Sequence, residues 1–156
     1  MVAIRSIVSA ADLATVRLLF QEYADSLGVD LCFQDFATEL ATLPGAYRPP
    51  SGALLLAERD GEAAGCVAMR PFEPPLVAEL KRLYVRSNAR GSGVGFALTE
   101  AALDLARQAG YARIRLDTLP TMAAAQTLYR RLGFREIAPY RPNPIPGAFY
   151  MERDLA

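Results

Sequence analysis

The sequence predicts one mixed α/β domain over residues 1–156, built from about seven strands and about four helices. Strand-like and helix-like segments alternate in the order β-α-α-β-β-β-α-β-α-β-β, which is typical of a sheet flanked by helices. A length of 156 residues suits one domain. Because 52% of the residues are hydrophobic, the chain can bury a substantial core.

Three strands and two helices are expected before residue 75. The strands are predicted at 3–8, 53–58 and 62–69, and the helices at 10–27 and 34–43. The first helix is supported by apolar residues at helical spacing, namely Leu13, Val16, Leu19, Phe20 and Tyr23. The second helix ends at Pro44-Gly45, and Asp60-Gly61 favours a hairpin turn between the second and third strands.

Four strands and two helices are expected in the rest of the chain. A proline-rich loop at 70–75 precedes a strand at 78–85, a loop at 86–95 and a helix at 94–109. A strand at 112–118, a helix at 120–132 and two strands at 134–137 and 149–155 follow. Gly110 and Gly133 stand where the two helices should end.

Charge and hydropathy exclude several classes of partner. The 17 acidic and 17 basic residues cancel, so nothing draws the whole chain to nucleic acid or to an anionic membrane. No apolar run approaches the roughly 18–20 residues that cross a bilayer. The first ten residues lack the zones of a signal peptide. We therefore expect a cytoplasmic protein that binds neither nucleic acid nor membrane.

The residue types also limit the chemistry. The chain contains no histidine, which excludes a His-assisted nucleophile and a histidine-rich zinc site, and we expect no metal. Cys32 and Cys66 do not form a CxxC pair, and Cys66 lies in an apolar stretch that predicts burial. Lys81 is the one lysine among the 17 bases, which reflects either compositional bias or a use of arginine in anion recognition.

A glycine-rich loop, Arg90-Gly91-Ser92-Gly93-Val94-Gly95, separates a predicted strand from a predicted helix. The first amides of a helix lack intrahelical partners, and the helix dipole adds positive charge there. Such a socket suits a phosphate or pyrophosphate, although the glycines could instead only make a tight connection. GxxxxGK[ST] is absent, and Phe96 breaks GxGxxG. The loop fits [QR]-x-x-G-x-[GA].

Three segments together resemble the GCN5-related N-acetyltransferase (GNAT) family, which uses acetyl-CoA: Leu83-Tyr84-Val85, the glycine-rich loop and Leu128-Tyr129-Arg130-Arg131-Leu132-Gly133-Phe134. The resemblance implies a mostly antiparallel twisted sheet whose fourth and fifth strands splay apart. Pantetheine would lie in the splay against the backbone of Tyr84 and Val85, and amides from Arg90 to Phe96 would bind the pyrophosphate. Met122 departs from the pattern, because many members have an asparagine at that position.

Tyr129 and Glu79 are the catalytic residues that the resemblance implies. Tyr129 would protonate the departing thiolate, since a phenol is protonated at neutral pH, although it could instead be core packing. Glu79, six residues before Val85, would accept the amine proton directly or through water, although it could instead be a solvated acid at the strand end. Strand alternation predicts that Glu79, Lys81, Leu83 and Val85 share a face.

Asp117 is a second candidate base, and its alternative role is to cap the turn before Pro120. The acceptor pocket is expected from residues 23–47 and from the loop 139–147. The loop carries Tyr140, Arg141 and Asn143 as candidate substrate-binding residues. The acids at 25, 30, 35 and 39 could attract a cationic amine or form a solvated face, and Arg141 could bind a carboxylate.

The resemblance implies an acetyl-CoA-dependent N-acetyltransferase that acts on a small-molecule or amino-acid-like primary amine, by direct attack in a ternary complex. Three alternatives stay open. The acceptor could be a protein N-terminus or lysine, the chain could be a non-catalytic acyl-CoA-binding regulatory module, or it could be an unrelated nucleotide-binding domain. Dimers are frequent among similar proteins, so a homodimer is one assembly to test.

Overall fold

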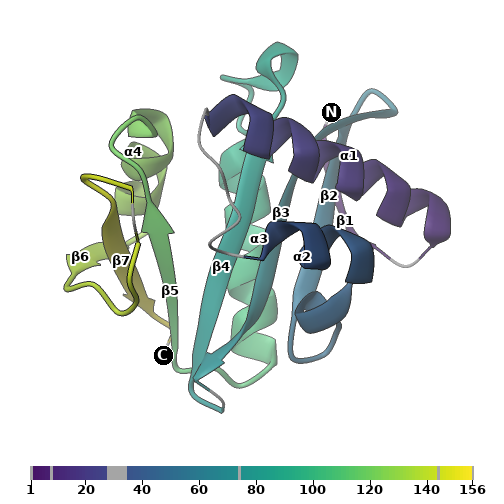
Figure 1. Ribbon diagram of the computed structural model, residues 1–156. Helices are drawn as coiled ribbons and strands as arrows, with labels where there is room; N and C mark the ends of the chain where they lie inside the picture. The colour runs from purple at the N-terminus through teal and green to yellow at the C-terminus, as the bar shows by residue number, and fades with distance from the viewer. Residues whose placement is uncertain (1, 8, 28–34, 74, 144, 156) are drawn as a thin grey trace.

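Seven strands form one sheet in the order β1-β2-β3-β4-β5-β7-β6 (Figure 1). The computed structural model describes residues 2–7, 9–27, 35–73, 75–143 and 145–155. β4 and β5 are parallel, and the other neighbouring strands in these ranges are antiparallel. The structure therefore confirms the mixed, mostly antiparallel sheet that the sequence predicts.

The elements lie close to their predicted ranges. The strands are β1 Val2–Ser6, β2 Ala53–Arg59, β3 Glu62–Glu73, β4 Val77–Val85, β5 Arg113–Thr118, β6 Arg135–Ile137 and β7 Phe149–Asp154. The helices are α1 Ala10–Leu27, α2 Phe36–Thr42, α3 Val94–Gln108 and α4 Ala123–Arg131, with short 3-10 turns η2 Gly45–Tyr47 and η3 Ser87–Ala89. The predicted positions Val8 and Gln34 lie outside the described residues.

β3 runs past the predicted end at Met69 and includes Pro71. The register explains this, because β2 begins at Ala53 opposite Met69, and beyond it β3 pairs with β4 only. A proline is tolerated in a strand that has a free side. The predicted loop at 70–75 is therefore wrong for residues 70–73, which continue the strand.

Helices cover both faces of the sheet, with α1 and α2 on one face and α3 on the other (Figure 1). Alternation along β2 sends Leu54 and Leu56 to the α1 layer and Leu55 to the α3 layer. Cys66 is fully buried in the α1 layer, which confirms its prediction, and burial raises the pKa of its thiol. Within the ranges given above, each helix is too short or too polar to cross a bilayer.

A β-bulge at Arg82 reverses the alternation of β4. Arg82 has a φ of 62°, and Lys81 pairs with Ala68 while Tyr84 pairs with Cys66, so the strand holds one extra residue there. Leu83 and Val85 therefore pack in the α3 layer, as do Ala78 and Leu80. The prediction that Glu79, Lys81, Leu83 and Val85 share one face is wrong, because the bulge lies between its two halves.

β4 and β5 pair only near their starts. Their register joins Val77 to Arg113, Ala78 to Ile114 and Glu79 to Arg115, and the strands diverge beyond this junction (Figure 1). β5, β7, β6 and α4 lie on one side of the opening, and β4 with the rest of the sheet lies on the other. The predicted splay between the fourth and fifth strands is thus present.

Candidate functional site

A cleft of about 530 Å³ opens where β4 and β5 diverge. α1, the end of β4, the glycine-rich loop and the first turns of α3 and α4 contribute to its lining. Among the predicted cofactor-binding residues, those that line it are Tyr84, Val85, Arg90, Gly91, Gly93, Val94 and Gly95. The structure therefore brings the end of the predicted strand and the predicted loop into one concave site, as expected of a ligand pocket.

The glycine-rich loop keeps the floor of the cleft open. Gly91 and Gly93 have φ values of 78° and 84°, which a side chain disfavours, and a Cβ at either position would meet nothing within 4 Å. No side chain caps α3 at Gly93. The first intrahelical hydrogen bond of α3 runs from the Ala97 amide to the Gly93 carbonyl. The preceding amides of this 15-residue helix are therefore available to an anion.

Ser92 and Phe96 lie outside the cleft lining. The Ser92 hydroxyl donates a hydrogen bond to the Ala89 carbonyl, and the Phe96 ring lies 5.6 Å from the Arg131 guanidinium. Their side chains thus have structural partners, and the role of their amides stays a prediction. Arg90, by contrast, lines the cleft and donates from Nε to the Val85 carbonyl at 3.1 Å.

Tyr129 lies beneath the cleft, beside a small cavity of about 30 Å³ that it helps to line. Tyr23, Leu83 and Met122 line both spaces, so the cavity adjoins the cleft. Tyr129 is 5% exposed and packs on Phe134 with ring centroids 5.5 Å apart. Burial raises the pKa of its phenol, so the hydroxyl is a proton donor at neutral pH. Tyr129 is therefore packed in the core beside the small cavity, and its role as an acid stays a prediction.

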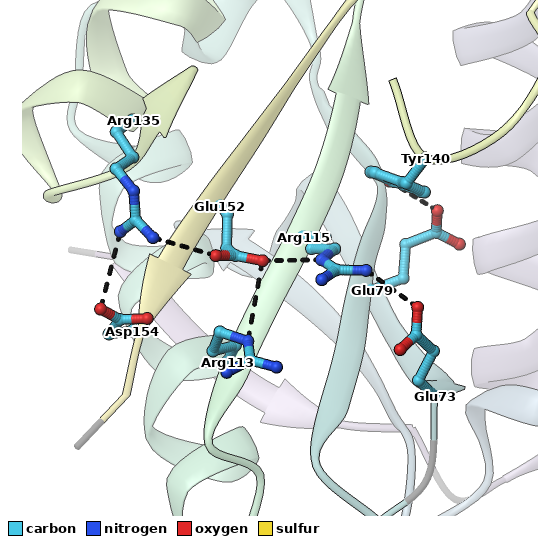
Figure 2. Close-up of polar contacts among 8 residues, drawn as sticks. All are labelled: Glu73, Glu79, Arg113, Arg115, Arg135, Tyr140, Glu152 and Asp154. Carbon is cyan, nitrogen blue, oxygen red and sulfur yellow. Dashed lines mark hydrogen bonds and ion pairs between the residues drawn. The ribbon is translucent and has the colours of Figure 1, made fainter. Parts of the chain in front are cut away.

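Glu79 lies in a different environment from the one predicted. Its side chain is fully buried, so the alternative of a solvated acid is wrong. Oε2 accepts from the Tyr140 hydroxyl at 2.9 Å (Figure 2). Oε1 accepts from Arg70 Nε at 2.9 Å, and Oε2 also contacts Arg141. Both carboxylate oxygens are engaged, and Glu79 lines neither the cleft nor the small cavity. Its role as a base stays a prediction, and its surroundings favour a structural role.

The three candidate substrate-binding residues fix residues 140–143 against β4 and β5. Tyr140 and Arg141 contact Glu79, and Asn143 Nδ2 donates to Asp117 Oδ2 at 3.2 Å. Burial lowers the pKa of Arg141, and the charge of Arg70 adds to the effect. The loop therefore reaches the same region as the cavity, although these side chains already have partners.

A network on the neighbouring strands supports this loop. Arg115 lies 5.7 Å from the Tyr140 ring and forms ion pairs with Glu152 at 2.7 Å and Glu73 at 2.9 Å (Figure 2). Arg135 also binds Glu152, at 3.0 Å. These contacts hold β5, β7 and β6 together below the loop.

Lys81 and Asp117 are the functional candidates that the structure brings forward. Lys81 is 8% exposed and lines the small cavity with Asp117, opposite in charge. Burial lowers the pKa of Lys81 to about 7, and the neighbouring charges of Arg82 and Arg70 act in the same direction. A further cavity of about 20 Å³ has both Asp117 and Asn143 in its lining. The one hint in the sequence was that this lysine stands alone among arginines.

The predicted acidic face near α1 and α2 is divided. Glu39 forms a two-point ion pair with Arg82, with both contacts at 2.9 Å, so it is neutralised. Asp25 and Asp35 are exposed, and Asp30 and Cys32 lie outside the described residues.

Met122 precedes α4 without a side-chain cap, consistent with its departure from asparagine. In the part of the chain that the structure describes, no three His, Cys, Asp or Glu side chains could together hold a metal ion.

Comparisons with known proteins agree with this geometry. The model of the acetyltransferase (GNAT) family matches residues 16–134. An uncharacterized N-acetyltransferase of Schizosaccharomyces pombe is 39% identical over 99% of this chain and 96% of its own length. The N-acetylaspartate synthetase of Rattus norvegicus is 34% identical over 83% of this chain and 44% of its own length. A GNAT-family acetyltransferase from Staphylococcus aureus shares the fold, with a TM-score of 0.82, 18% identity and full coverage of both chains.

Proposed function

Because the chain belongs to the acetyltransferase (GNAT) family, we propose that it moves an acetyl group from acetyl-CoA to the primary amine of a small-molecule or amino-acid-like acceptor. The observation that carries this proposal is the junction between the cleft and the small cavity lined by Tyr129 and Asp117. The rat relative, named for N-acetylaspartate, supports a small amino acceptor.

Two features of the cleft support acetyl-CoA as its ligand. The diphosphate would bind the free amides at the start of α3, where Gly91 and Gly93 leave open space. The pantetheine would lie along the backbone of Tyr84 and Val85, on the side of β4 that faces the opening. When bound, acetyl-CoA supplies an acetyl thioester, a carbonyl activated by a good leaving group.

In the transfer a C–N bond forms and the C–S bond breaks. The nitrogen of the ammonium loses one proton before attack and a second as the amide forms, and the sulfur gains one, so one proton is released overall. The amine must lose a proton, and for a pKa of about 10.4 this costs roughly 4 kcal/mol at pH 7.4. Asp117 lines the cavity and is the better placed acceptor of that proton, directly or through water. The departing sulfur gains a proton, which Tyr129 can donate because its phenol stays protonated.

The proposal is tested in two steps with purified protein. Acetyl-CoA should raise the melting temperature, because a ligand that binds the folded state stabilises it. CoA thiol should then appear with at least one amine from a panel of amino acids, polyamines, aryl amines and peptides, and product mass should identify the acetylated acceptor.

The outcomes separate the alternatives. Release of CoA with peptides alone would favour a protein acetyltransferase, and binding without release for any amine would favour a regulatory module. Light scattering after size exclusion tests the homodimer, and fractionation tests the cytoplasmic location, both of which stay predictions.

A further inference from the structure

The opening between β4 and β5 has a fixed order along β4. The strands pair at 77–79 and 113–115, and the small cavity, with Lys81 and Leu83 in its lining, comes next (Figure 1). The cleft follows, with Leu83, Tyr84 and Val85 in its lining. The glycine-rich loop and the start of α3 come after the end of β4 and also line the cleft. The small cavity is therefore the inner end of the opening, nearest the junction of the strands.

This order determines which end of acetyl-CoA would reach the small cavity. In the proposed binding mode the diphosphate lies at the start of α3 and the pantetheine lies along Tyr84 and Val85. The thioester is at the end of the pantetheine remote from the diphosphate, so it would point away from the glycine-rich loop and toward Leu83. Because Leu83 also lines the small cavity, the acetyl group would lie at the entrance of that cavity.

Lys81 brings a primary amine to the same cavity. Its side chain is buried, and it lines the cavity on the β4 side with Asp117 of β5 opposite. It is the single lysine of the sequence, so the cavity holds the one side-chain primary amine of the chain. Tyr129 lines the cavity too, and burial raises the pKa of its phenol, so a protonated group lies nearby.

The surroundings of Lys81 favour the neutral amine, which is the nucleophilic form. Burial and two arginines lower its pKa, two carboxylates raise it, and two phenols line its cavity. Among the described residues these groups are Arg82 of β4, Arg70 of β3, Asp117 of β5, Glu39 of α2, Tyr23 of α1 and Tyr129 of α4. Burial is the largest effect, and the pKa falls from 10.5 to about 7. At pH 7.5 most of Lys81 is therefore neutral, against about one part in a thousand for an ordinary lysine.

We propose that Lys81 is a self-acetylation site, at which the protein transfers the acetyl group of its own bound acetyl-CoA to Nζ. This inference rests on the proposed binding of acetyl-CoA and goes beyond the proposed acceptor. The Nζ lone pair forms the C–N bond with the acetyl carbonyl carbon, and the C–S bond breaks with its electron pair on the sulfur. The nitrogen loses one proton and the sulfur gains one, so neutral lysine yields N-acetyllysine and CoA with no proton released.

The single lysine allows a direct test by mass. The protein is incubated with acetyl-CoA at pH 7.5 without any added amine, and its intact mass should rise by that of one acetyl group. Endoproteinase Lys-C cuts after lysine but not after acetyllysine. After denaturation, the starting chain should therefore give two fragments, 1–81 and 82–156, and the acetylated chain should stay whole. Lys81→Arg removes the acceptor nitrogen and should gain no mass.

Two controls separate this reaction from acetylation in free solution. Desulfo-CoA, which lacks the reactive sulfur, should compete for the cleft and suppress the modification. Arg135→Lys adds a second lysine where the native side chain is 57% exposed and lines neither the cleft nor the small cavity. That lysine should be acetylated about a hundredfold more slowly than Lys81, because its neutral fraction is far smaller and no bound thioester lies beside it.

The amine can also be observed without acetyl transfer. Lysine labelled with ¹³C at Cε gives one NMR signal in this chain, because Lys81 is its single lysine. The signal should titrate with a midpoint of about 7 and should shift when CoA is added. The midpoint tests the neutral amine, and the shift tests the contact between the small cavity and the cleft.

Several results would overturn this inference and leave the proposed function standing. They are an unmodified Lys81 in protein that acetyl-CoA stabilises, a gain of mass that persists in Lys81→Arg or with desulfo-CoA, equal acetylation of the lysine in Arg135→Lys, and a signal that titrates near the ordinary 10.5 or ignores CoA. No thermal shift with acetyl-CoA and no turnover with any amine would overturn the proposed function, and this inference with it. If Lys81→Arg does not fold, Lys-C digestion of the protein without substitutions identifies the modified site.

Discussion

Burial of Lys81 should make the stability of the fold depend on pH between 6 and 8. The pKa of Lys81 falls from its ordinary 10.5 to about 7 in the folded chain, chiefly because burial disfavours the charged form. Above pH 7 the folded state therefore binds fewer protons at this group than the unfolded state does. By linkage, the free energy of unfolding rises with pH across this range and levels off below it.

The size of the effect follows from the two pKa values. One unit of difference corresponds to 1.36 kcal/mol, and integrating the proton difference from pH 6 to pH 8 gives a gain of about 1.4 kcal/mol. The chain contains no histidine, so the side chains that usually titrate in this interval are absent. The reference pKa values of aspartate and glutamate side chains lie at about 4, below this interval.

Urea unfolding at pH 6, 7 and 8, followed by circular dichroism at constant ionic strength, measures this directly. The unmodified protein should gain about 1.4 kcal/mol, most of it between pH 7 and 8. Lys81→Met removes the titrating group, so its free energy of unfolding should change far less across the same interval. An unmodified protein whose stability is flat from pH 6 to 8, or a variant with the same rise, would refute the reasoning.

Three further predictions test other parts of the site. Tyr129→Phe should lower kcat about a hundredfold or more while the thermal shift by acetyl-CoA is unchanged, and equal turnover would exclude an acid role. Glu79→Gln should cost about 3 kcal/mol in urea unfolding, because two guanidinium groups lose their carboxylate, whereas the exposed Glu136→Gln should have little effect. Gly65→Ala would place Cβ 2.5 Å from the Tyr84 carbonyl and so displace the end of β4. Calorimetry should then show weaker acetyl-CoA binding, and unchanged affinity would argue against a role for this backbone.

The order of elements was predictable because each segment carries its own local pattern. The apolar spacing of Val16, Leu19 and Phe20 is sufficient for the buried face of α1, and all three lie in the core. The place of the glycine-rich loop was predictable for the same reason. Glycines directly before a helix leave the first amides of that helix accessible, which is typical of an anion site. The end of β3 was not, because it depends on where β2 begins to pair.

The chemistry on β4 depended on two features that no local pattern reveals. The residue with left-handed backbone in the bulge is Arg82, and arginine rarely adopts this conformation. No glycine or asparagine in the sequence therefore indicated that the side chains of β4 change faces there. The burial of Glu79 and Lys81 depends on distant segments, as the contact between Glu79 and Tyr140 shows across 61 positions. A charged side chain within a strand is read as exposed until such partners are known.

The short junction between β4 and β5 has a mechanical consequence. Three residue pairs, at 77–79 and 113–115, join the two parts of the sheet, so a small rotation there is magnified at the mouth of the opening. Substitutions at these six positions should change the width of the cleft, although none of the six residues lines it. Hydrogen exchange of the β5 amides, measured with and without CoA, would show whether the two parts of the sheet open independently and whether bound CoA suppresses that opening.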